Sequence, residues 1–251
     1  MYDFLIFISY TIGIVALSII GMFIVRRSIS ISTLESHHEV AGFIYAIVGG
    51  VYAVLIAFVV LVVWEQFNSA EERNIHEASC VSTIYRTSRS FDNESKEKIK
   101  ELLRNYCESM IKYEFPAMID MKTSDENKKA YLEIWEYLVK FTPKSDMEKL
   151  WYPKVQDILT SLQDARRLRQ NSINFGIPPF MWIIIIVGAI ITISFTYLFG
   201  TKKVMPQAIM VVMLSLMISL VLLLISALEN PFSGIIRVDA EPFESVLKIL
   251  L

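Results

Sequence analysis

The segment FIYAIVGGVYAVLIAFVVLVVW at residues 43–64 decides the fold of this chain. It holds 22 residues without one charged side chain, and about 20 apolar residues let a helix cross the roughly 30 Å of hydrocarbon in a bilayer. Three further windows of similar length are also free of charge, at residues 4–25, 180–199 and 207–228. We therefore predict an integral membrane protein with four transmembrane helices.

Charge is concentrated between the second and third windows. Residues 66–178 hold 18 of the 26 acidic residues and 18 of the 24 lysines and arginines. This balance leaves no basic block, so the stretch lacks the electrostatic footprint of a nucleic-acid-binding domain. Apolar residues such as Val155, Leu159 and Leu162 recur there at helical spacing, which predicts amphipathic helices.

The predicted fold class is therefore all-α, with a helical soluble domain inserted between transmembrane helices two and three. The expected boundaries are 1–65 for transmembrane helices one and two, 66–178 for the soluble domain, 179–228 for helices three and four, and 229–251 for a C-terminal tail. In the tail, Glu241-Pro242-Phe243 opens a short amphipathic helix, which we expect to lie on the membrane surface or on the protein's own domain.

The short loops predict the orientation in a bacterial inner membrane. Loops at 26–42 and 200–206 each carry two cations near a helix end, namely Arg26, Arg27, Lys202 and Lys203. Short loops rich in lysine and arginine stay in the cytoplasm. Both termini and the soluble domain are then expected outside the cytoplasm. The first apolar window is expected to remain as a transmembrane helix and not to be cleaved as a signal peptide, because Arg26 and Arg27 follow it instead of preceding it.

Local signals place the helices of the soluble domain. The second transmembrane helix is expected to continue through Ser90, and the next helix to run from Ser95 to Glu114, where Pro116 stops it. Capping-box spacing of Thr123 with Glu126, and of Ser145 with Glu148, predicts the starts of two more helices, the first ending near Phe141.

Two cysteines lie at equal distances from the turn expected at residues 91–95. Cys80 and Cys107 would therefore reach the same height in a helical hairpin. Two interpretations remain open: a disulfide in an oxidising compartment, or two thiols buried in a helical core.

Small residues form one face of the second transmembrane helix, at Ala46, Gly50, Ala53 and Ala57. Such faces allow close approach of another helix in the membrane, which could belong to the same subunit or to a neighbour. An adjoining stripe contains Tyr45, Gly49, Tyr52 and Ile56. If copies of this helix surround an axis, the stripe could line a pathway; alternatively, Tyr45 is an ordinary interfacial aromatic residue.

Titratable residues flank this helix at both ends. Glu35, His37, His38 and Glu39 precede it, and Glu65, Glu72 and His76 follow it. At the mouths of a pathway they would attract cations and respond to pH; the alternative is an ordinary solvated surface. The 38 helical residues between His38 and His76 span about 57 Å at 1.5 Å per residue, which excludes one metal site joining them. We find no motif for catalysis, a metal or a cofactor.

Several short stretches resemble a family of bacterial membrane proteins described as bestrophin-like. They are His37-His38-Glu39-Val40-Ala41-Gly42, Trp64-Glu65-Gln66-Phe67 with Ala70-Glu71, Glu77-Ala78, Arg86, and Pro231-Phe232-Ser233-Gly234 with Glu241-Pro242-Phe243. The resemblance covers nearly the whole chain. It implies an oligomeric membrane protein related to the anion-conducting bestrophins, whose soluble part is cytoplasmic. That placement is opposite to the one predicted from the loops.

The leading hypothesis from the sequence is a homo-oligomeric ion channel in the lipid bilayer, with transmembrane helix two lining the path of inorganic ions. Acidic mouths favour cations, whereas the family resemblance implies anions. The competing hypothesis is a non-conducting membrane sensor or scaffold that binds a partner through its soluble helical domain. An enzyme is not expected.

Overall fold

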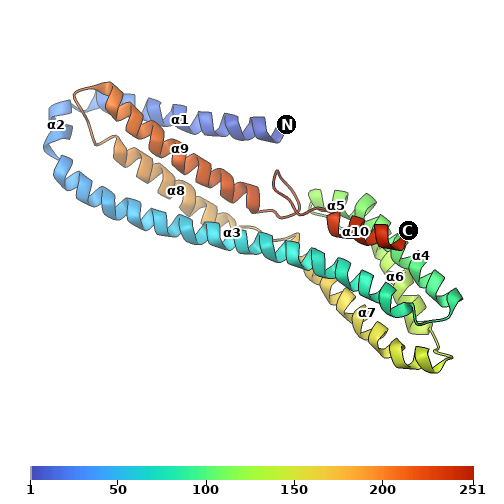
Figure 1. Cartoon of the computed structure of the whole chain (residues 1–251). Coiled ribbons are helices and arrows are strands. Elements are labelled where there is room, and N and C mark those ends of the chain that lie inside the picture. The colour runs from blue at the N-terminus through green and yellow to red at the C-terminus, as the bar shows by residue number, and fades with distance from the viewer. Residues whose placement is uncertain (1) are drawn as a thin grey trace. The chain divides into compact units, whose positions relative to one another are not determined.

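Helices make up all the regular structure that the computed structural model describes, which covers the backbone of residues 2–251 and the side chains of residues 8–35 and 37–251. In chain order they are α1 (Tyr2–Ser28), α2 (Ile31–Ser36), α3 (His38–Ser88), α4 (Asn93–Ser109), the π-helical η1 (Met110–Glu114), α5 (Phe115–Ile119), α6 (Asp125–Lys140), α7 (Asp146–Ser172), α8 (Pro179–Thr196), α9 (Val204–Leu228) and α10 (Glu241–Leu250) (Figure 1). The all-α prediction is confirmed.

Four of these helices are long and apolar enough to cross a membrane: α1, α3, α8 and α9. Helices α1, α3 and α9 contain three of the windows expected from the sequence, and the remaining window, 180–199, extends three residues beyond α8. Helix α3 is 51 residues long and continues without a break from the apolar window into the polar stretch. It ends at Ser88 rather than at Ser90.

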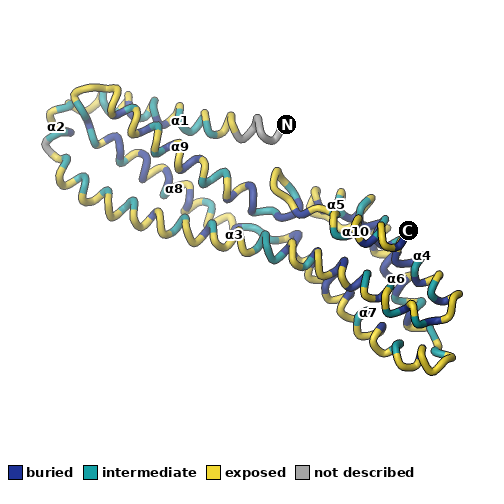
Figure 2. Tube along the Cα trace, in the orientation of Figure 1, coloured by how far each residue is buried: buried dark blue, intermediate teal, exposed yellow. Residues whose placement is uncertain are grey.

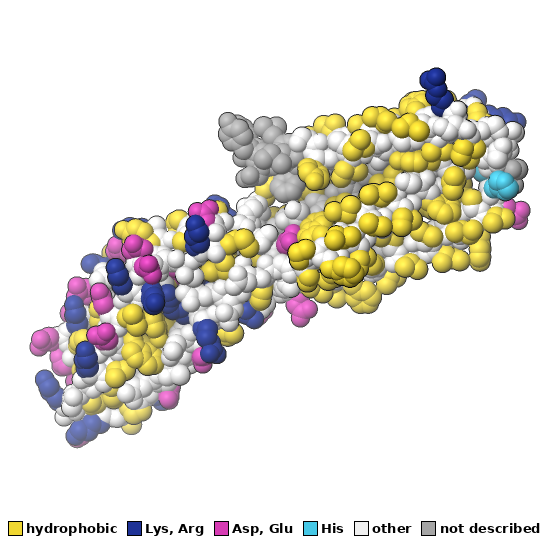
Figure 3. Space-filling view, turned by 180° about the vertical axis from the view of Figure 1, so that it is seen from behind, with side chains coloured by type: hydrophobic (Ala, Val, Ile, Leu, Met, Phe, Trp, Pro, Cys, Tyr) yellow, Lys and Arg dark blue, Asp and Glu magenta, His cyan; other side chains and the backbone are white. Residues whose placement is uncertain are grey.

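The chain divides into two compact units, residues 1–64 with 176–229 and residues 65–175 with 230–251. In the first unit, α1 packs along α9 and also contacts α8. Its buried cluster includes Met22, Tyr52, Ile193, Val211 and Ile218. Hydrophobic side chains cover this unit, whereas lysine, arginine and acidic side chains gather on the second (Figure 3).

The core of the second unit lies among α4, α6, α7 and α10 and includes Leu103, Tyr106, Leu138 and Leu159. Helix α10 buries one face against this core, through Phe243, Val246 and Leu250. The C-terminal helix therefore packs on the soluble domain, one of the two surfaces expected for it. Val155, Leu159 and Leu162 are also buried, as their spacing in α7 predicts.

Pro116 does not end the second helix of this unit, contrary to the prediction. The chain widens into η1 after Ser109, and Pro116 then lies in the first turn of α5. The α-helical pattern starts again at Phe115, after the wider π-helical turn, and a proline is tolerated near the start of such an element. The helical path consequently continues to Ile119.

The predicted capping residues are half right. Ser145 and Glu148 form the expected capping box at the start of α7. The cap of α6 is Ser124 and not Thr123: its Oγ accepts hydrogen bonds from the backbone N–H groups of Glu126 and Asn127. Helix α6 ends at Lys140, one residue before the expected end.

Cys80 and Cys107 are free thiols, and both are buried in the core of the second unit. Of the two interpretations, the structure contains the buried thiols and not the disulfide. Burial raises the pKa of the Cys107 thiol to about 12, so this thiol stays protonated and unreactive at neutral pH.

Candidate functional site

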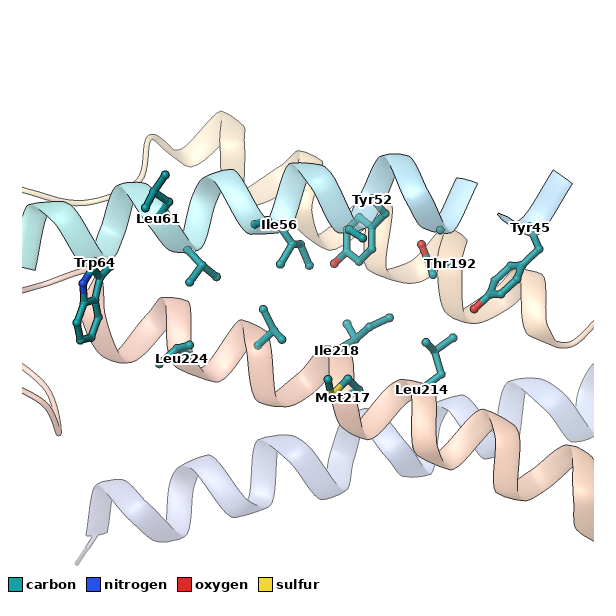
Figure 4. A pocket seen from close by; sticks show the side chains of 15 residues that line it. Tyr45, Tyr52, Ile56, Leu61, Trp64, Thr192, Leu214, Met217, Ile218 and Leu224 are labelled. Carbon is teal, nitrogen blue, oxygen red and sulfur yellow. The ribbon is translucent and has the colours of Figure 1, made fainter. Parts of the chain in front are cut away.

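A cavity of about 770 Å³ lies along α3 in the first unit, facing α8 and α9. All four residues of the predicted stripe line it: Tyr45, Gly49, Tyr52 and Ile56. Leu214, Met217, Ile218 and Leu224 of α9 face them across the space (Figure 4). The remaining lining residues are Ala53, Ala57, Val60, Leu61, Trp64, Thr192 and Val221. This lining contains no charged side chain, so the cavity suits hydrocarbon better than a bare ion.

Tyr52 attaches α3 to α8. Its hydroxyl donates a hydrogen bond to the backbone oxygen of Ile185 at 3.1 Å, and its ring lies against Gly188. A Cβ atom at Gly188 would approach that ring to 2.6 Å. The phenol thus finds its partner within the subunit, because a free hydroxyl in an apolar layer is unfavourable. Tyr52 is not available to a pathway between subunits, as the stripe hypothesis required.

Tyr45 also packs within the first unit. Its ring centroid lies 5.8 Å from that of Phe195 and 5.5 Å from that of Phe199. Phe199 contacts His38 as well, with 6.0 Å between the ring centroids. These rings join the beginning of α3 to the end of α8 and the turn that follows it. The two tyrosines of the stripe therefore pack within the subunit, whereas a Cβ atom at Gly49 would meet nothing within 4 Å.

The small residues Ala46, Gly50, Ala53 and Ala57 are all exposed. A Cβ atom built at Gly50 would meet nothing within 4 Å. Ala53 and Ala57 border the cavity toward α8 and α9, whereas Gly50 has no neighbour from another helix of the same subunit among the described residues. Figure 2 shows how little of α3 is covered: along residues 38–64 the buried positions are Tyr52, Val59 and Val63.

Bulky apolar side chains occupy the face of α3 opposite to Tyr52. Leu61 follows Tyr52 by nine residues, about two and a half turns at 3.6 residues per turn, so it leaves the helix on the opposite side, although its side chain also borders the cavity. The exposed side chains on this side are Phe43, Ile47, Val54, Phe58 and Leu61. We call these five residues the apolar face of α3.

Glu65 and Glu72 continue the apolar face. Glu72 follows Val54 by 18 residues, about five full turns, and Glu65 follows it by 11, about three turns. Both carboxylates are exposed, as is His76. The tyrosine stripe and these acids were predicted to belong to one pathway; along a single helix the two sets lie on different faces.

The titratable residues that precede the apolar segment of α3 differ from one another in their exposure. Glu35 lies on α2 and is half-buried, whereas His37 and Glu39 are exposed. His38 turns its ring toward Phe199, and its Nε2 is buried without a hydrogen-bond partner among the described residues. His37 and Glu39 are therefore exposed, while His38 belongs to the packing around Phe199.

A buried ionic cluster in the second unit was missed by the sequence analysis. Arg169 donates from Nε to Glu77 Oε2 at 2.6 Å and from Nη2 to Glu114 Oε1 at 3.1 Å, and all three side chains are fully buried. Tyr106 donates its hydroxyl proton to Glu77. Burial and the negative charge of Glu77 raise the pKa of Tyr106 well above its ordinary value. We call these four residues the ionic cluster.

The π-helical segment supplies part of this cluster. Arg169 Nη2 lies 3.1 Å from Glu114 Oε1 and 3.6 Å from Met110 Sδ, residues at the two ends of η1. The second oxygen of Glu114 accepts the backbone N–H of Ser124 at 2.7 Å, just before α6. A wider helical turn thus lets one segment present both groups to the same guanidinium. Glu77 lies on the buried face of α3, seven residues after Ala70 and seven before Ile84. This helical spacing is the sequence signal that could have identified Glu77 as buried.

Comparison with known proteins gives a family and a fold. The model of the Bestrophin-like domain matches residues 12–243. No curated protein matches the chain. The crystal structure of a bacterial Bestrophin homolog from Klebsiella pneumoniae, solved by Zn-SAD phasing, is similar with a TM-score of 0.73 and 13% sequence identity, over 96% of this chain and 97% of that chain. A mutant of that homolog gives a TM-score of 0.74 at 13% identity, with the same coverage.

Proposed function

Because the chain belongs to the bestrophin-like family of membrane proteins, we propose that it is an ion channel, a symmetric oligomer in which the apolar face of α3 lines the conduction path. The observation that carries this proposal is the exposure of that face: it lies opposite to the side of α3 that packs on α8, and it continues into Glu65 and Glu72. A symmetric ring of such helices would place these residues around one axis.

The small-residue face supports the oligomer. Ala46, Gly50, Ala53 and Ala57 form a smooth, exposed strip, in which Gly50 has no neighbour from another helix of the same subunit among the described residues and Ala53 and Ala57 border the cavity. In lipid, helices associate through close packing of such small residues, since no hydrophobic force drives them together. A neighbouring copy of α3 is the partner that we assign to this strip.

The path would consist of an apolar constriction between two titratable mouths. Rings of Val54, Phe58 and Leu61 would form the constriction, which can stop ions by losing its water. Glu65 and Glu72 would lie at one mouth, and His37 and Glu39 at the other. The acids favour cations, whereas the family resemblance implies anions. The reversal potential measured in a salt gradient determines whether the channel conducts cations or anions.

The topology proposed from the loops places the second unit outside the cytoplasm of a bacterial inner membrane. Arg26, Arg27, Lys202 and Lys203 carry this assignment through the positive-inside rule. The resemblance to bestrophins implies the reverse. Conduction through α3 is compatible with both orientations, so the topology is tested separately.

Reconstitution of the full-length protein into liposomes tests the channel. We expect ion flux that rises when Phe58 is replaced by alanine, because the constriction widens, and that changes its ion preference in E65Q. Phe180→Ala, an exposed aromatic position on α8, is the matched control and should leave the flux unchanged. The absence of flux in every salt for wild type and F58A would reject the channel and favour the sensor or scaffold hypothesis.

Chemical cross-linking tests the oligomer independently. A cysteine at Gly50 should form a disulfide-linked dimer on mild oxidation in membranes. The control is a cysteine at the exposed Ile190 of α8, which should remain monomeric. A monomer for Gly50→Cys, together with a monomeric mass in detergent, would contradict the assembly.

A further inference from the structure

A closed loop at residues 231–238 follows α9 in the chain. The backbone N–H of Val238 donates to the backbone oxygen of Pro231 at 2.8 Å, so the two ends of the loop meet. Gly234 has a φ of +98°, which glycine adopts without the strain that a side chain would cause. The loop is therefore a compact turn of the backbone with a fixed base.

The tip of this loop combines two apolar side chains with a cation. Ile235 is 44% exposed and Ile236 is 42% exposed. Arg237 follows them; it is exposed and has no salt-bridge partner among the residues that the structure describes. The nearest acid in the sequence, Asp239, instead accepts the backbone N–H of Glu241 through Oδ1 at 3.0 Å. We call residues 235–237 the loop tip.

The base of the loop lies in a cluster built by the three segments that connect the apolar helices to the second unit. Phe232 is buried there together with Ala70 and Ile173. Ala70 follows the apolar window of α3 by six residues, Ile173 precedes α8 by six, and Phe232 follows α9 by four. The chain connections therefore keep this cluster close to the membrane.

The loop tip is also within reach of the bilayer surface. Helix α9 has 25 residues and is about 37 Å long at 1.5 Å per residue. It is longer than the roughly 30 Å of hydrocarbon in a bilayer, so its ends reach the headgroup layers. Ile235 follows Leu228, the last residue of α9, by seven positions, and seven residues span at most about 25 Å. The chain cannot carry the tip further than this from the end of the membrane helix.

We propose that the loop tip is a membrane anchor of the second unit, in which Ile235 and Ile236 enter the interfacial layer and Arg237 binds the phosphate of an anionic phospholipid. Burial of the two isoleucines removes apolar surface from water. The guanidinium can donate two parallel hydrogen bonds to one phosphate, and the negative potential of an anionic membrane surface attracts it. The anchor does not depend on conduction along α3.

Site-directed fluorescence tests the insertion of the tip. The full-length protein with Ile235→Cys is labelled with an environment-sensitive fluorophore and reconstituted into vesicles of phosphatidylglycerol and phosphatidylcholine. Its emission should shift to shorter wavelength, and lipids that carry bromine on the acyl chain should quench it. Ile249→Cys, a similarly exposed isoleucine of α10, is the matched control and should be quenched by aqueous iodide instead. The native Cys80 and Cys107 are buried and should not be labelled.

Two outcomes of this measurement would overturn the proposal. In the first, iodide quenches the label at position 235 as strongly as the label at position 249, which means that the tip stays in water. In the second, neither quencher reaches position 235, which means that protein covers the tip, as contact with a neighbouring subunit would.

A charge variant tests the anionic headgroup with the same label at position 235. R237Q should lower the ratio of inserted to exposed loop in vesicles that contain phosphatidylglycerol by about fivefold, the factor that corresponds to about 1 kcal/mol per arginine at an anionic surface. In vesicles of phosphatidylcholine alone, the proteins with and without R237Q should give similar ratios. R167Q, at an exposed position of α7, is the control and should leave both ratios unchanged. An identical response to phosphatidylglycerol with and without R237Q would overturn the binding of an anionic phospholipid.

Discussion

Arg169 donates from Nε to Glu77 Oε2 at 2.6 Å, and both side chains are fully buried in the second unit. Glu77 is on α3 and Arg169 is on α7, so this ion pair joins the long helix to a helix 92 residues away in sequence. Burial disfavours the charge of Arg169, but Glu77, Tyr106 and Glu114 offset it, so the pKa of Arg169 lies above its ordinary value. The guanidinium therefore remains charged at every pH at which the protein is folded.

Replacement of Arg169 by methionine should destabilise the second unit strongly. It would leave Glu77 and Glu114 as two buried carboxylates without a cation, and loss of one partner from a buried pair typically costs about 3–5 kcal/mol. Chemical denaturation followed by tryptophan fluorescence measures this loss, because Trp135 and Trp151 lie in the second unit. Arg167→Met, at an exposed position of the same helix, should change the unfolding free energy by less than about 1 kcal/mol. Equal effects of the two variants would contradict the role of the cluster.

Glu148 should make the stability of the second unit dependent on acidic pH. Backbone hydrogen bonds from Ser145, Lys144 and Asp92 hold the pKa of its carboxyl below the ordinary value. A depressed pKa in the folded state stabilises the protein above the unfolded pKa, about 4.3, and this contribution is lost as pH falls through the folded pKa.

Glu148→Gln should therefore be less stable than wild type at pH 7, and the difference should shrink below about pH 4. Urea unfolding at a series of pH values measures it. The control is Asp157→Asn, a residue of the same helix that carries no capping role. A difference between wild type and E148Q that is independent of pH would show that the carboxylate charge is not involved.

Gly188 should tolerate no larger residue while Tyr52 is present. Alanine there would bring its Cβ to 2.6 Å from the Tyr52 ring, and forced repacking of this kind costs about 1–3 kcal/mol. G188A should lower the melting temperature of the purified protein in detergent. Gly13→Ala is the control, since nothing lies within 4 Å of a Cβ at that position. If G188A has the same melting temperature as wild type, the contact between α3 and α8 is not as described.

The orientation can be read from labelling with a maleimide that does not cross membranes. A cysteine at Met147, exposed in the second unit, should be labelled in intact spheroplasts, and a cysteine at Lys203 only after permeabilisation. This outcome follows from the cations of the two short loops. The reverse pattern would reject the loop-based prediction and agree with the orientation implied by the family resemblance.

The sequence predicted the fold well because its signals are local. Runs of about 20 apolar residues specify membrane helices without any knowledge of tertiary contacts, and the box of Ser145 with Glu148 depends on residues three positions apart. Pro116 was misjudged because no local signal predicts the π-helical turn before it, in which Glu114 contacts Arg169, a residue 55 positions further along the chain.

The candidate site was predicted only in part. Helical spacing grouped Tyr45, Tyr52 and Ile56 correctly on one face, but spacing alone does not say whether a face packs inside the subunit. The position of Gly188 opposite Tyr52 decided this point, and it lies 136 residues further along the chain. Arg169 was overlooked because an arginine near the end of a helix is usually exposed. Its buried partners, the carboxylates of Glu77 and Glu114, can be identified only in the structure.

Cysteine accessibility during conduction tests the central claim most directly. The full-length protein with Val54→Cys should lose its current within seconds of adding a charged methanethiosulfonate reagent, because this exposed side chain lies on the apolar face of α3. Val59→Cys, at a buried position on the packed side of the same helix, should conduct unchanged. The native Cys80 and Cys107 are buried and should not contribute. A current that is blocked at Val59→Cys and unaffected at Val54→Cys would contradict the account.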